Sequence, residues 1–194
     1  MSVQTNPKRL VIGITGASGA VYGIRLLQLL RKTGDIETHL VISDAAEVTL
    51  QHEVGVALNE VCLLADRVYA VNDMAAAIAS GSFNSVGMIV APCSMRTLSA
   101  IAHGFCDNLI TRAADVMLKE RRRLVLMTRE TPLNLAHIRN MQSVTEMGGI
   151  IYPPVPAFYC HPVTIDEMVN QTLRRVLELF DIRDGEMIQW NGLV

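Results

Sequence analysis

The amino-acid sequence predicts an α/β fold, a single Rossmann-like domain with an open, mostly parallel sheet and helices on both faces. Two observations support this prediction. Six short apolar segments alternate with stretches of helical periodicity, and no stretch of the 194 residues resembles an interdomain linker. We therefore expect one domain over residues 1–194, with a flexible N-terminus at 1–7 and a C-terminal tail at 181–194 that packs on a neighbouring subunit.

The first strand, turn and helix form the most distinctive element. Leu10 to Ile14 is mostly β-branched and apolar, as in a strand buried on both faces, and the glycine-rich segment 16–19 interrupts it. Apolar residues then recur at helical spacing from Val21 onward. The N–H groups of such a turn point along the helix axis and favour an anion, so we interpret the segment as a phosphate cradle.

The glycine spacing does not identify the ligand of that turn. It is G-x-x-G-x-x-G, whereas dinucleotide-binding proteins carry G-x-G-x-x-G and an acidic residue at the end of the second strand. Here the second strand ends in Ser43-Asp44, so a hydroxyl precedes the acid. A mononucleotide is at least as plausible as NAD, and a tight turn without a ligand is the third interpretation.

The remaining elements continue the alternation. Strands are expected at residues 37–43, 67–71, 86–91, 124–127 and 150–152, and helices at 45–51, 58–65, 108–120 and 134–147. Thr131-Pro132 is expected to start the last of these, with Pro132 at the first helical position, and a capping box at 164–167 precedes the final helix. The apolar stripe of that helix leaves Arg174 and Arg175 on the surface. Segment 73–83 is expected to be a loop, with its turn at 80–82, that either closes over a ligand or only connects two elements.

The composition excludes several classes of protein. Half of the residues are hydrophobic, yet no apolar run approaches the roughly 20 residues that a membrane helix needs, so we expect no membrane partner and attribute the apolar excess to an oligomer. The net charge of −2 gives no reason to expect nucleic acid. The four cysteines are widely separated, which indicates neither a metal site nor a disulfide framework and favours the cytoplasm.

Candidate ligand groups gather where the expected strands end, at one edge of the sheet. They are rich in hydroxyls and positive charge and form no Ser-His-Asp or Cys-His signature, so phosphate binding is the function that the residues themselves indicate. Ser94 has a second interpretation as the N-cap of the next helix. Arg112, Asp115 and Lys119 share one helical face, for which ordinary pairing of Asp115 with Lys119 is the simpler interpretation. The edge group comprises Ser18, Ser43, Ser94, Thr97, Arg129, Glu130 and Tyr159.

Longer motifs carry a resemblance to a known family. TGASGA, ASGSF, APCSMRTLS, RAADVMLKERRRLVLMTRETPL and PPVPAFYCHP resemble the bacterial flavin prenyltransferase family of UbiX type, within the flavin-containing cysteine decarboxylase superfamily. The resemblance extends over almost the whole chain. Arg96 is a departure, because it stands where relatives often have a small residue or Lys.

The resemblance implies an activity and partners. Such enzymes transfer a dimethylallyl group from dimethylallyl phosphate to N5 and then C6 of reduced FMN, and the prenylated FMN serves a UbiD-type decarboxylase of the ubiquinone or phenolic-acid type. The family forms a homododecamer and uses no metal. Two alternatives are an FMN-dependent cysteine-type decarboxylase, whose P-A-S-A-N-T segment and Met-Asn signature are absent here, and a non-catalytic flavin-delivery protein, which would not need Glu130 and the cations.

The resemblance also implies roles for individual residues. Ser18 would relay or accept a hydrogen bond at N5, Glu130 would protonate the leaving phosphate, and Glu53 would assist proton removal. Trp190 would shield the allyl cation through its π face. The FMN-binding residues would be Gly16, Ala17, Ser18, Ser43, Ser94, Met95, Arg96, Thr97 and Arg129. The residues around the prenyl phosphate, some of them supplied by neighbouring subunits, would be Arg112, Lys119, Glu130, Tyr159, Arg175 and Trp190.

Overall fold

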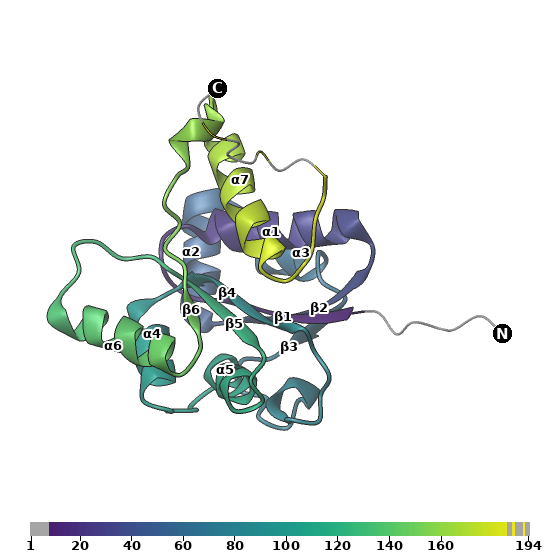
Figure 1. Ribbon diagram of the computed structural model, residues 1–194. Helices are drawn as coiled ribbons and strands as arrows, with labels where there is room; N and C mark the ends of the chain where they lie inside the picture. Colours follow the sequence, from purple (N-terminus) through teal and green to yellow (C-terminus); the bar gives the residue numbers. More distant parts are fainter. Residues whose placement is uncertain (1–7, 186–187, 189–191, 193–194) are drawn as a thin grey trace.

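Six parallel strands form one sheet in the order β3-β2-β1-β4-β5-β6 (Figure 1). The computed structural model describes residues 8–185, 188 and 192. The strands are β1 (Lys8–Ile14), β2 (Ile36–Ile42), β3 (Arg67–Tyr69), β4 (Gly87–Cys93), β5 (Arg123–Thr128) and β6 (Ile150–Ile151). The order reverses between β1 and β4, which is the Rossmann arrangement and places a ligand crevice beyond the carboxyl ends of these two strands. The predicted fold class is confirmed.

Helices cover both faces of the sheet (Figure 1). One face carries α1 (Ala20–Thr33), α2 (Asp44–Val54), α3 (Leu58–Cys62) and α7 (Ile165–Glu178). The other carries the short 3-10 helix η1 (Ala77–Ala79), α4 (Met95–Ala102), α5 (Leu109–Lys119) and α6 (Leu135–Glu146). A second 3-10 helix, η2 (Phe158–Cys160), lies in the connection from β6 to α7.

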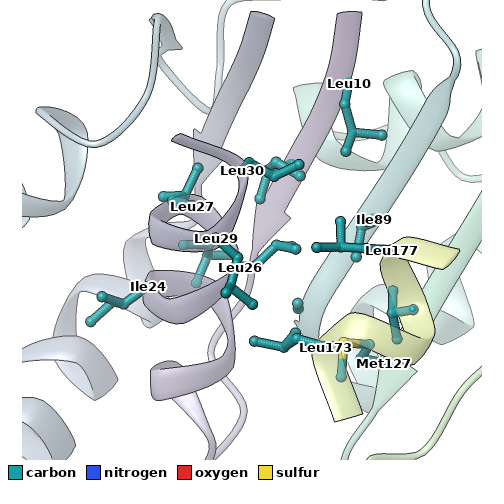
Figure 2. Close-up of a cluster of buried hydrophobic side chains, with 14 of the residues drawn as sticks. Leu10, Ile24, Leu26, Leu27, Leu29, Leu30, Ile89, Met127, Leu173 and Leu177 are labelled. Atoms are coloured by element: carbon teal, nitrogen blue, oxygen red, sulfur yellow. The ribbon is translucent and has the colours of Figure 1, made fainter. Parts of the chain in front are cut away.

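Alternation along β1 divides the core into two layers. Leu10, Ile12 and Ile14 pack on the α1 face, whereas Val11 packs on the α5 face. Figure 2 shows the first layer, where leucines of α1 and α7 meet side chains of the central strands. Each fully buried leucine contributes about 1.5–3 kcal/mol by leaving water. A Cβ on Gly23 would lie 2.6 Å from the carbonyl oxygen of Ala91, so this glycine lets α1 approach β4 closely near the crevice.

The start of α6 and one half of the capping box before α7 differ from the predictions. α6 begins at Leu135, and Asn134 is its N-cap, with a side chain that accepts a hydrogen bond from the His137 N–H (2.9 Å). Pro132 therefore precedes the helix, because Asn134 satisfies the first free amides further along. At α7, Thr164 caps the Glu167 N–H as expected (3.1 Å), but the Glu167 carboxylate bonds the Val163 N–H (2.7 Å), so the reciprocal half of the capping box is missing.

Arg174 was expected on the surface and is instead largely buried. Its side chain is 14% exposed and pairs with Asp184, which is 12% exposed, at 2.7 Å. Further along the tail, the Gln171 side chain on α7 donates to the Ile188 carbonyl (2.8 Å). Helical periodicity placed Arg174 off the apolar stripe, but the segment after α7 folds back and covers it.

Candidate active site

Backbone hydrogen bonds join the loops that follow β1, β2, β4 and β5. The Ser43 N–H donates to the Ile14 carbonyl (3.0 Å), and the Arg129 N–H donates to the Cys93 carbonyl (3.2 Å). The Thr15 hydroxyl donates to the Pro92 carbonyl and accepts from the Ser94 N–H, both at 2.8 Å. The loops that carry most of the predicted FMN residues are therefore fastened to one another at the carboxyl edge.

A cavity of about 590 Å³ opens at this edge, within the range of roughly 300–1,000 Å³ found for small-molecule sites. Five of the nine predicted FMN residues line it, namely Gly16, Ser43, Ser94, Arg96 and Thr97. The lining also includes Asn72, Asp107 and Asn108, which the sequence did not single out. Asn108 had a usable signal, because it caps α5 in the manner of a helix-starting asparagine.

Both serines at this cavity also cap helices. The Ser43 hydroxyl accepts from the Ala46 N–H (3.3 Å) at the start of α2, and the Ser94 hydroxyl accepts from the Thr97 N–H (3.3 Å) at the start of α4. The capping interpretation of Ser94 is therefore correct, and it is compatible with a place in the cavity wall. Two helix N-termini consequently face the cavity, and their partial positive charge favours an anionic group.

Gly16 is required by the close approach of the β1–α1 turn to α2. A Cβ at this position would lie 2.9 Å from the carbonyl carbon of Ala45 and would also collide with the Ala45 side chain. The glycine thus allows the turn and the start of α2 to form one continuous wall.

The Arg96 side chain is paired with a carboxylate of the same chain. It forms an ion pair with Asp107, whose second oxygen accepts a hydrogen bond from the Thr111 hydroxyl (3.3 Å) in the cap of α5. This pair joins α4 to the loop before α5 at the rim of the cavity. In the free protein the guanidinium of Arg96 is therefore already balanced by a negative charge.

The interpretation of the glycine-rich turn as a phosphate cradle needs a correction. The N–H groups of Gly19 (2.8 Å) and Ala20 (2.9 Å), at the start of α1, both donate to the carboxylate of Glu53 from α2. An anion does occupy the helix N-terminus, as the geometry predicts, but it belongs to the protein. The partner is 34 residues away from Gly19, so no local pattern identifies it.

Glu53 also links Ser18 to Arg129. Burial raises the pKa of the Glu53 carboxyl, whereas hydrogen bonds from the Ser18 side chain and from the two N–H groups, with the nearby charge of Arg129, lower it. The lowering contributions prevail, so the pKa of Glu53 lies below its ordinary value of 4.5. The carboxylate is consequently charged at neutral pH and is a weak base. Burial raises the pKa of Tyr22, and the same Arg129 charge partly opposes this shift.

Arg112 and Lys119 lie on α5 beside segment 79–83. Arg112 donates to the Ala79 carbonyl (3.1 Å) and pairs with Asp115 (2.6 Å), while Lys119 pairs with Glu120. The expected pairing of Asp115 with Lys119 is therefore wrong. Arg122, to which the sequence assigned no role, donates to the carbonyls of Gly81 and Phe83 and fastens the same segment.

Arg175 lies on α7, on the opposite face of the sheet from α5, and both Arg175 and Tyr159 influence the pKa of Tyr152. Burial raises the pKa of Tyr152, the charge of Arg175 lowers it, and Tyr159 raises it slightly further. Arg175 itself forms an ion pair with Glu178. Glu130 is exposed at the end of β5, where its carboxylate accepts from the Thr131 N–H (3.1 Å). Trp190 lies outside the described residues.

The predicted site residues thus fall into two sets. The residues predicted to bind FMN, here called the flavin half, include Gly16, Ser43, Ser94, Thr97 and Arg129 at the carboxyl edge. The residues predicted to bind the prenyl phosphate, here called the prenyl-phosphate half, include Arg112 and Lys119 on α5 together with Glu130, Tyr159 and Arg175. Arg112 and Lys119 lie on α5 and Arg175 lies on α7, and these two helices cover opposite faces of the sheet (Figure 1).

The described residues contain neither a metal-binding group of side chains nor a membrane-spanning helix. Among residues 8–185, 188 and 192, no group of three or more His, Cys, Asp or Glu side chains could hold a metal ion. No helix in the described part of the chain is long and apolar enough to cross a membrane.

The chain is a flavoprotein by its match to the Flavoprotein family model over residues 1–193, and the edge cavity lies where folds of this class bind nucleotides. The flavin prenyltransferase UbiX of Neisseria meningitidis is 56% identical over 186 residues, which is 96% of this chain and 98% of the relative. The chain belongs to the UbiX flavin prenyltransferase family.

Solved structures support the assignment. The crystal structure of AnUbiX in complex with FMN and dimethylallyl pyrophosphate has a TM-score of 0.95 and 52% identity, over 97% of this chain and 100% of the other. A dodecameric FMN-dependent UbiX-like decarboxylase from Escherichia coli O157:H7 has a TM-score of 0.92 and 47% identity, over 95% and 100%.

Proposed function

We infer that this chain is a flavin prenyltransferase that joins a dimethylallyl group to N5 and C6 of reduced FMN. The observation that carries the inference is its 56% identity, over nearly the full length, to a named enzyme of that activity. The cavity at the switch point between β1 and β4 agrees with it, because a flavin mononucleotide needs a long crevice with phosphate-binding groups at one end.

The residues at the edge suit FMN. Hydroxyls of Ser43, Ser94 and Thr97 stand at two helix N-termini and would hold the phosphate, and Arg129 would add a positive charge. Reduced FMN supplies the nucleophilic atoms that accept the prenyl group. Ser18 would lie at the reactive edge, where its hydroxyl donates to Glu53 and can accept or relay a proton. Because the pKa of Glu53 is low, we assign this carboxylate chiefly to holding the turn and Ser18 in place.

The prenyl phosphate requires positive charge and one acid. Arg112, Lys119 and Arg175 would neutralise the charge that develops on the departing phosphate, and Tyr159 would donate a hydrogen bond. Glu130 would protonate the phosphate, because a carboxylate beside a phosphate is repelled unless it shares a proton. Closing the site against water would strengthen each of these interactions.

The placement of the prenyl-phosphate residues on two faces of the sheet favours an oligomer. We propose that α5 of one copy faces α7 of another, so that cations on opposite faces of the sheet meet at a subunit interface. Exposed apolar side chains are available for such contacts, among them Leu135 and Ile138 on α6 and Phe158 and Val163 before α7. A dodecamer, as in the UbiX-like relative, would bury them. The prenylated FMN would pass to a UbiD-type decarboxylase, and the four free thiols fit the cytoplasm.

The test is an anaerobic incubation of the purified chain with reduced FMN and dimethylallyl phosphate, followed by extraction and mass spectrometry of the flavin. A flavin heavier by one five-carbon unit supports the transferase. Unmodified FMN together with loss of carbon dioxide from a cysteinyl substrate would instead support the decarboxylase alternative. Bound but unchanged FMN, with neither reaction, would indicate flavin delivery. A parallel incubation with the diphosphate measures which donor is preferred.

A further inference from the structure

We propose that Thr15 is a positioning residue that holds the Ser18 turn and the Ser94 turn in register around the flavin cavity. Thr15 is 1% exposed, so its hydroxyl is not in contact with solvent. That hydroxyl donates to the Pro92 carbonyl and accepts from the Ser94 N–H, each at 2.8 Å. Both partners lie 77 or more residues away, beyond the end of β4.

The backbone makes only part of this connection. The ladder between β1 and β4 runs only to the pair Gly13↔Val90. Pro92 has no N–H to return a hydrogen bond, although its carbonyl accepts from the Thr15 N–H (3.2 Å). The Thr15 side chain reaches the next available donor, the Ser94 N–H, and so extends the pairing past the end of the sheet.

Both joined loops contribute to the cavity wall, through Gly16 and Ser94. In the first loop the Thr15 carbonyl accepts from the Ala17 N–H (2.8 Å), directly before Ser18. In the second loop Ser94 caps α4 and lines the cavity. Together with the Thr15 N–H, the Thr15 hydroxyl therefore holds the turn that carries Ser18 against the turn that carries Ser94. The inference rests on the proposed function for the identity of the ligand, FMN.

The experiment compares Thr15→Val, which keeps the shape and removes the hydroxyl, with Thr15→Ser, which keeps the hydroxyl. Thr128→Val is the matched control. Thr128 is 2% exposed at the end of the neighbouring β5, and among the described residues its hydroxyl has no hydrogen-bond partner. The measurements are the Kd for FMN, the visible circular dichroism of the bound flavin, and the melting temperature of each protein.

We expect Thr15→Val to raise the Kd for FMN at least about tenfold and to alter the flavin circular dichroism, because the Ser94 N–H loses its partner. Thr15→Ser and Thr128→Val should stay close to the parent protein in the Kd for FMN and in the flavin circular dichroism. A lower melting temperature of Thr15→Val with an unchanged Kd and spectrum would overturn the proposal, since Thr15 would then only stabilise the fold.

If Thr15→Val does not fold, Thr15→Ser and Thr15→Ala decide the question, because both lack the methyl group and differ only in the hydroxyl. Equal FMN affinity of these two would overturn the proposal, and weaker binding by the alanine variant alone would support it. The prenylation assay is scored separately. A parent protein that binds FMN and makes no prenylated product would refute the proposed function, while the affinity comparison would still decide the role of Thr15.

Discussion

The flavin half and the prenyl-phosphate half of the candidate site differ in how far one chain assembles them. The flavin half lies at a single edge, where Ser43 and Ser94 cap α2 and α4 and Thr15 joins the loops after β1 and β4. In the prenyl-phosphate half, Arg112 and Arg175 lie on opposite faces of the sheet. The difference predicts that loss of subunit contacts affects prenyl transfer more than FMN binding, because the cations proposed to hold the prenyl phosphate lie on two faces of one chain.

The largest expected effect is that of Glu130→Gln on transfer. Losing the acid should slow prenyl transfer by roughly 10²- to 10⁴-fold, while FMN binding stays intact. Single-turnover formation of the prenylated flavin, measured together with a titration of FMN, checks both statements. If Glu130→Gln loses FMN instead, its carboxylate belongs to the flavin half and the acid assignment fails.

The subunit-sharing proposal predicts complementation between two inactive variants. Lys119→Ala and Arg175→Ala should each slow transfer by about 10²- to 10³-fold, because each removes one charge that stabilises the departing phosphate. Mixed oligomers, formed by unfolding and refolding the two variants together, should recover about one quarter of the activity, because each site draws its two sides independently. Mixing the assembled variants without exchange is the control. Mixed oligomers no more active than their parents would place both residues in a site within one chain.

Gly16→Ala should damage the flavin half alone. The added Cβ collides with Ala45, and overpacking of this kind costs about 1–3 kcal/mol in the free energy of unfolding. FMN affinity should fall because the turn must move away from α2. Denaturant unfolding and FMN titration measure the two effects. The matched control is Gly34→Ala, whose Cβ would meet no atom within 4 Å although its positive φ adds local strain.

The smallest expected effect is that of Glu53→Gln, and it depends on pH. Because the folded-state pKa of Glu53 is depressed, its contribution to stability is present above its ordinary value of 4.5 and is lost as the pH falls through the folded-state pKa. At pH 7 the variant should be less stable by about 0.5–1 kcal/mol, as for loss of a charged helix cap. Melting curves of the two proteins should differ at pH 7 and should converge as the pH falls below 4.5 and through the folded-state pKa of Glu53. A gap that persists in acid would mean that the charge of Glu53 is unimportant.

Local patterns were sufficient for most of the fold. Strand and helix alternation gave the sheet and its two covered faces, and hydroxyls at strand ends gave the position of the cavity. These local patterns failed in two places. Asn134, only two residues beyond Pro132, caps α6 and sets its start, and Arg174 is covered by Asp184 from a segment that folds back. Periodicity describes one element at a time and does not include such neighbours.

The sequence by itself determined that a glycine-rich turn ends the first strand, that helix N-termini with serine caps stand at one edge, and that an anion is favoured there. These features follow from backbone conformation and capping, which depend on a few adjacent residues. Only the tertiary structure decided that Glu53 is the anion at the start of α1, and that the cations of α5 and α7 lie on opposite faces. Those outcomes depend on which helices cover which face of the sheet, and that arrangement forms only when the whole chain packs.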